Sequence, residues 1–97
     1  MTDELHELEV PPDATDQGGH EVLRCFVVGG GLSVSLRRSF DDPSTWGVLL
    51  ADLARHAARI YALETECTED EALGAIKDMF DAEWSSPTDR GTTRASH

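Results

Sequence analysis

Three consecutive glycines, at positions 29–31, separate two runs rich in β-forming residues, 20–28 and 32–37. Glycine accepts the positive φ angles that a tight hairpin turn requires. Two such runs joined by a short glycine turn predict a β-hairpin.

The alternation of side chains fixes the register of this hairpin. Residues that lie opposite each other in a sheet share a face, so the apolar positions of both runs must pair with one another. A two-residue turn at Gly29 and Gly30 achieves this, because it pairs Val27 with Leu32. One face then carries Leu23, Cys25, Val27, Leu32, Val34 and Leu36. The other carries Val22, Arg24, Phe26, Val28, Ser33, Ser35 and Arg37.

Two helices are expected after the hairpin. Asp42 and Pro43 favour a helix start, and apolar residues then recur at three- and four-residue steps to about Leu63. These are Trp46, Leu49, Leu50, Leu53, Ala57 and Ile60. Thr68 and Glu71 predict a capping box at the start of the second helix. Its apolar residues are Leu73, Ile76, Phe80 and Trp84.

This order of elements predicts an α+β fold of two layers, a β-hairpin packed on an antiparallel helical pair. We expect a single domain over residues 20–84. Residues 1–19 read as an acidic extended arm that could add a short N-terminal strand before Pro11 and Pro12 stop it. Residues 85–97 lack an apolar period and are expected to be a disordered tail.

The formal net charge is -11 over 97 residues. Such a surface repels phosphate backbones and anionic lipids, so we expect neither nucleic acid nor membrane as a partner. The sequence lacks a signal peptide pattern, which favours a cytoplasmic protein. Two cysteines imply no disulfide framework. We expect Cys25 to be shielded by the helices and Cys67 to be accessible.

No residue pattern indicates catalysis, a cofactor or a metal. The glycines at 29–31 lead into a strand, whereas a phosphate-binding loop leads into a helix. The four histidines show no zinc-helix spacing. Capping explains the carboxylates of Glu69, Asp70 and Glu71. We therefore expect a protein that is not an enzyme.

The hairpin face with Arg24, Phe26, Val28 and Arg37 is the candidate functional surface, because it mixes cationic and apolar side chains. One hypothesis is a non-enzymatic homo-oligomeric protein-interaction module, with a homodimer expected, since a two-stranded hairpin is marginal alone. The alternative is a sensor that binds a small anionic ligand through the arginines. The arginines could instead pair with acidic residues of the arm or of a second subunit.

Four stretches are familiar in combination: LHELEVPPDA at 5–14, EVLRCFVVGGGLSVSL at 21–36, DPSTWGVLLADLA at 42–54 and FDAEW at 80–84. Together they resemble a small, uncharacterised bacterial family classed as a domain of unknown function. The resemblance covers about residues 4–89. It implies a compact bacterial cytoplasmic domain and carries over no catalytic residues.

Overall fold

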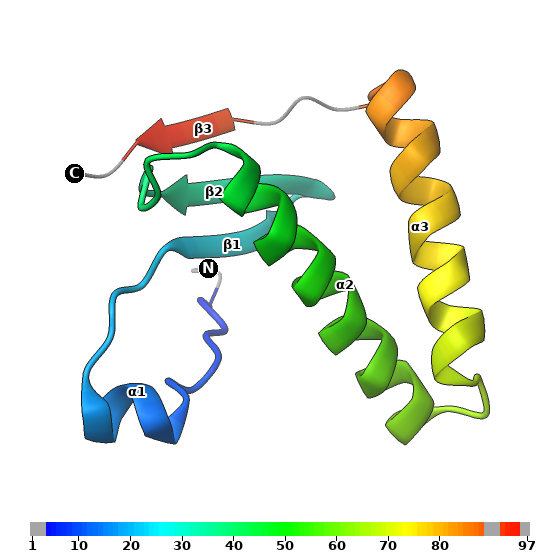
Figure 1. The fold of residues 1–97 in the computed structure, drawn as a ribbon, viewed down its shortest axis with the longest axis horizontal. Coiled ribbons are helices and arrows are strands. Elements are labelled where there is room, and N and C mark those ends of the chain that lie inside the picture. The colour runs from blue at the N-terminus through cyan, green and yellow to red at the C-terminus, as the bar shows by residue number, and fades with distance from the viewer. Residues whose placement is uncertain (1–3, 89–91, 96–97) are drawn as a thin grey trace.

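The computed structural model describes residues 4–88 and 92–95. Within them the chain forms a three-stranded sheet beside a helical pair (Figure 1). The α+β class, the hairpin and the two packed helices are confirmed. In chain order the elements are α1 (Pro12–Gln17), β1 (Leu23–Val28), β2 (Gly31–Leu36), α2 (Ser44–Glu64), α3 (Glu69–Ser85) and β3 (Thr92–Ala95).

The hairpin has the predicted register. Strands β1 and β2 are antiparallel, with Val27 opposite Leu32 and Cys25 opposite Val34. Gly29 and Gly30 both have positive φ, 57° and 81°. This combination is typical of a turn whose twist matches that of the strands.

Strand β3 corrects the prediction of a disordered tail. Residues 92–95 pair in parallel with β2, from Ser33 opposite Thr92 to Leu36 opposite Ala95. The edge of β2 offers unpaired backbone groups, and an added strand satisfies them without any apolar period of its own. The rest of that prediction, for residues 89–91 and 96–97, lies outside the described residues.

The N-terminal arm is not extended throughout. Residues 12–17 form the short helix α1, in which the amide of Ala14 donates to the carbonyl of Pro11 over 3.1 Å. Pro12 is suited to this place, because its fixed φ fits the first helical turn, where no amide donor is needed. Residues 4–11 contain no strand, so the short N-terminal strand is absent from the described part of the arm.

Local signals set the ends of the two long helices. At the start of α2, Asp42 Oδ1 accepts from the amide of Ser44 over 2.9 Å. At the start of α3 the capping box is complete: Thr68 Oγ1 accepts from the Glu71 amide, and Glu71 Oε1 accepts from the Thr68 amide, both over 3.1 Å. Both predicted helix starts are confirmed.

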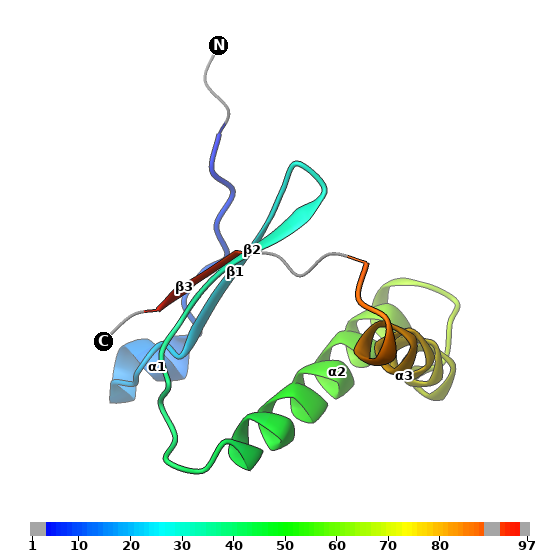
Figure 2. The same ribbon diagram turned by 90° about the horizontal axis from the view of Figure 1, so that it is seen from above.

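The core of a single chain is very small. Among the described residues only Ala58 and Ala72 are buried, at 0% and 6% exposure. These small side chains let α2 and α3 approach closely. Figures 1 and 2 show the two helices diverging from the loop that joins them.

The sheet and the helical pair do not form the predicted two-layer core. Strand contacts strand and α2 contacts α3, but within the described residues no strand packs on a helix. The link between the two parts is local: Trp46 Nε1 donates to the carbonyl of Arg38 over 2.9 Å, and the Trp46 and Phe40 rings meet edge to face, with centres 5.6 Å apart. Apolar periodicity shows which faces avoid water, but it does not show what covers them.

Candidate functional site

The candidate surface lies on one face of the hairpin. Arg24 and Phe26 belong to β1, and Arg37 follows β2, where its amide donates to the carbonyl of Val22. Because alternate residues of a strand share a face, this register puts Arg24, Phe26 and Arg37 on the same side of the sheet. The sequence therefore predicted the grouping correctly.

Arg24 is the most connected residue of this face. Its Nη2 atom lies 2.8 Å from Glu7 Oε2, and its Nε atom lies 3.1 Å from Glu21 Oε2. Its guanidinium carbon stands 5.6 Å from the centre of the Phe26 ring. The hydrogen bond to Glu7, reinforced by the charge of Glu21, raises the pKa of Arg24 above its usual value.

These contacts give Arg24 a structural partner in the arm. Glu7 is seventeen residues away in the chain, so the ion pair ties the acidic arm to β1. This is one of the alternatives that the sequence leaves open. A ligand anion would have to displace Glu7, although an exposed pair of this kind holds only weakly.

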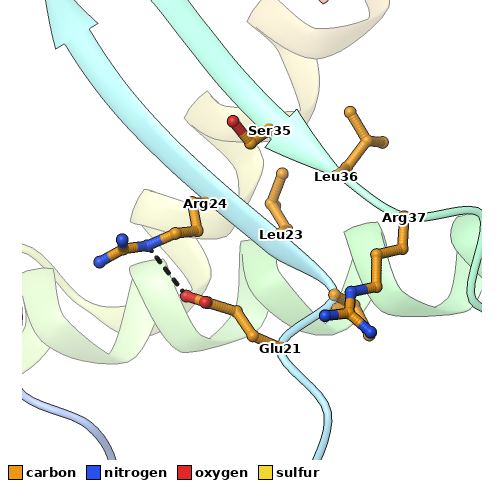
Figure 3. Close-up of a pocket in the computed structure, with 7 residues that line it drawn as sticks. Glu21, Leu23, Arg24, Ser35, Leu36 and Arg37 are labelled. Atoms are coloured by element: carbon orange, nitrogen blue, oxygen red, sulfur yellow. Dashed lines mark ion pairs between the residues drawn. The ribbon is translucent and has the colours of Figure 1, made fainter. Parts of the chain in front are cut away.

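A shallow hollow of about 110 Å³ opens at the end of the hairpin away from the turn. Figure 3 shows Glu21 and Arg24 pointing toward each other, while the Arg37 guanidinium lies on the opposite side of the hollow from that of Arg24. Ligand pockets usually measure about 300–1,000 Å³. The hollow is therefore smaller than a pocket that encloses a drug-sized ligand, and it suits only a small anion. Its lining residues are Glu21, Val22, Leu23, Arg24, Ser35, Leu36 and Arg37.

The turn end of the hairpin is apolar on both faces. Val28, from the candidate surface, is 64% exposed. On the opposite face, Val27 and Leu32 are 78% and 53% exposed. We expected the helices to cover that opposite face, and they do not.

The two thiols also depart from expectation. Cys25 is exposed, because no helix covers its face of the sheet, and Cys67 is partly buried. The Cys67 thiol lies 3.4 Å from the carbonyl of Thr68, to which it donates. The prediction that Cys25 is shielded is wrong for the single chain.

Other chemistry finds little support in the part of the chain that the structure describes. Across residues 4–88 and 92–95, no three potential metal ligands gather into a site. No helix in those ranges has the length and apolar character to cross a membrane.

The sequence reasoning missed a second surface on α2. Several of its large apolar residues are exposed, including Leu50, Leu53 and Ile60 at 43%, 45% and 52%. Their spacing at three- and four-residue steps predicts an apolar face. It does not predict that this face stays uncovered by the sheet and the other helix.

Comparison with known proteins yields a close structural relative. The chain is 50% identical to a solved structure from the photosynthetic bacterium Rhodopseudomonas palustrus CGA009, described as a "putative pyruvate dehydrogenase". The similarity covers 99% of this chain and 100% of that chain, with a TM-score of 0.74. No curated protein matches. Residues 7–88 match the family described as "Domain of unknown function (DUF5076)", and the chain therefore belongs to that family, as the resemblance implied.

Proposed function

We propose that this protein is a homo-oligomeric protein-interaction module without catalytic activity of its own. One observation carries the proposal: a single chain exposes far too much surface. Its accessible surface is 8673 Å², whereas a folded monomer of 10.6 kDa exposes about 5,500 Å². The radius of gyration is 15.4 Å, against about 12.5 Å for a compact domain of this length.

The surplus surface is apolar in large part. Fifteen large hydrophobic side chains of the described residues are exposed, and they occur on the arm, the hairpin and both long helices. Soluble monomers rarely expose apolar surface on this scale, and large exposed apolar patches are typical of interfaces. Obligate homodimers commonly bury about 2,000–5,000 Å² in total, and their interfaces resemble a core divided between two chains.

A second copy of the chain is the partner best suited to cover this exposed apolar surface. A chain that lacks a core needs its partner whenever it is folded, and another copy of itself is always present at the same concentration. Twofold pairing also lets one apolar patch cover itself. The exposed apolar area thus supports a homodimer.

Binding of a small anion is the second candidate. Within the described residues Arg37 makes no ion pair, and it borders the hollow. A volume of about 110 Å³ suits an inorganic anion such as phosphate. A thermal-shift titration with phosphate tests this, because a ligand at 100 times its Kd stabilises the folded state by about 2.7 kcal/mol. Unchanged melting up to high phosphate would exclude it.

The description of the solved relative suggests pyruvate oxidation as a further activity. That chemistry needs an organic cofactor to hold the carbanion and pass on electrons. The hollow at the hairpin is too small to enclose such a molecule. The residues that line the hollow therefore do not fit such a cofactor.

Light scattering of the purified protein at micromolar concentration tests the main proposal. The expected mass is twice 10.6 kDa, about 21 kDa. A mass of one chain at every concentration would contradict it.

A further inference from the structure

Helix α2 has two distinct apolar faces, and only one of them is covered. Ala58 is fully buried, and Ala54 and Ala62, four residues to either side, are partly buried. Among the described elements α2 packs on α3 alone, so we infer that this row faces α3. At 100° per residue, Ala58 lies about 140° around the helix from Leu53. The helix α3 that covers Ala58 therefore leaves the face of Leu53 open.

The open face follows a coiled-coil spacing. Trp46, Leu50, Leu53, Ala57 and Ile60 follow one another at steps of four, three, four and three residues. This is the spacing of residues that pack knobs into holes against another helix. Trp46 packs against Phe40 but stays partly exposed, so the whole row belongs to this surface. We call it the α2 stripe; it consists of Trp46, Leu50, Leu53, Ala57 and Ile60.

We propose that the α2 stripe packs against the same stripe of a second copy of this chain, so that two helical pairs form a four-helix bundle. This inference rests on the proposed homodimer and assigns its contact surface to the helices rather than to the hairpin.

Charge favours the α2 stripe over the surface of α3. The chain carries a net charge of -11, so two copies repel wherever carboxylates face each other. Helix α3 carries a series of acidic residues from Glu69 to Glu83 against Lys77 alone. The α2 stripe contains no charged residue. Two copies that meet there therefore bury no carboxylate of the stripe itself.

The chain as a whole also exposes enough surface for a second copy to cover. A specific interface takes about 800 Å² from each partner. The chain exposes 8673 Å², roughly 3,200 Å² more than a folded monomer of its mass. A helix-to-helix contact centred on the α2 stripe needs only part of that surplus.

Twofold symmetry makes the contact specific enough to test. The heptad-spaced residues run from Trp46 to Ile60, and Leu53 lies midway between them. In a contact of one patch with its own copy, the middle of the patch meets the middle of the other. Two packed helices lie about 8–10 Å apart, so cysteines at position 53 of both chains would come within reach of a disulfide.

Disulfide trapping is the direct test. Cys25 and Cys67 are first replaced by serine, and Leu53→Cys is then compared with Arg55→Cys under mild oxidation. Arg55 is the matched control, because it is an exposed position of the same helix about 200° away from Leu53. We expect Leu53→Cys to form covalent dimer at least ten times faster than Arg55→Cys. Equal rates, or no covalent dimer at position 53, would overturn the assignment.

Two charge substitutions separate this inference from the proposed function. We expect Leu53→Asp to lower the mass measured by light scattering toward one chain, and Phe26→Asp to leave it at two. If Phe26→Asp alone dissociates the dimer, the hairpin face is the interface, and the α2 stripe is wrong while the homodimer stands. If the unmodified protein is a monomer, or is found bound only to a different protein, both proposals fail.

Discussion

The substitution Thr68→Ala tests how much the capping box of α3 contributes to the stability of the protein. The hydroxyl of Thr68 satisfies the Glu71 amide, and the Glu71 carboxylate satisfies the Thr68 amide, each over 3.1 Å. Alanine at position 68 leaves the Glu71 amide without a hydrogen-bond partner in the protein. Amides in the first turn of a helix have no preceding turn whose carbonyls could accept from them.

The expected cost is about 1 kcal/mol, as for other caps of this type. For a domain of this size, that corresponds to a fall in Tm of about 4–8 °C. In a homodimer the substitution removes one cap from each chain. The entropy of unfolding is then also that of two chains, so the expected shift in Tm is the same. Thermal unfolding followed by far-ultraviolet circular dichroism measures it.

A double-mutant cycle tests whether the two hydrogen bonds of the capping box stabilise each other. Because the two bonds are reciprocal, Thr68→Ala and Glu71→Ala together should cost less than the sum of the single changes. Glu69→Ala is the control: it removes a charge from the same turn, and Glu69 is neither partner of the capping box. Strict additivity, or an equal effect of Glu69→Ala and Glu71→Ala, would refute the capping argument.

Four further outcomes are expected. Two glycine substitutions should change the free energy of unfolding in opposite directions. Gly30→Ala should destabilise the protein by about 1–2 kcal/mol, because φ at this position is 81° and an L-residue is strained there. Gly74→Ala should instead stabilise it by about 0.5–1 kcal/mol, because the added methyl group enters open space in a helix; urea unfolding measures both changes. Native labelling with a thiol reagent should modify Cys25 faster than Cys67, and the reverse order would show that the sheet face is covered. Added salt should tighten the dimer by screening the repulsion between two chains of net charge -11, as measured by sedimentation at several salt concentrations. The hydrogen bond from the Thr68 amide lowers the pKa of Glu71, so the stabilisation by this carboxylate is complete above its unfolded-state pKa and is lost as the pH falls through its folded-state pKa. The difference in Tm between the unmodified protein and Glu71→Ala should accordingly shrink in acid.

Sequence patterns predicted the features of this fold that depend on neighbouring residues. The pairing of Val27 with Leu32 follows from the parity of two alternating runs and a glycine turn. The start of α3 follows from Thr68 and Glu71, which lie three residues apart. The grouping of Arg24 with Arg37 follows from the same hairpin register.

Features that depend on distant parts of the chain were not predictable in this way. Strand β3 pairs with β2 through backbone groups, and its residues, from Thr92 to Ala95, show no pattern that announces a strand. The ion pair of Arg24 with Glu7 needs an arm position that the acidic composition does not specify. The α2 stripe was visible as an apolar period, but a period does not distinguish a face that packs within one chain from a face that packs between two.

The central claim is that one copy of this chain does not complete its own core. Urea unfolding at two protein concentrations 100-fold apart tests it most directly. If folding requires association, the higher concentration adds about 2.7 kcal/mol of apparent stability, which moves the midpoint upward by on the order of 1 M urea. Superimposable unfolding curves at the two concentrations would contradict the claim, because a self-sufficient monomer unfolds at the same midpoint at any concentration.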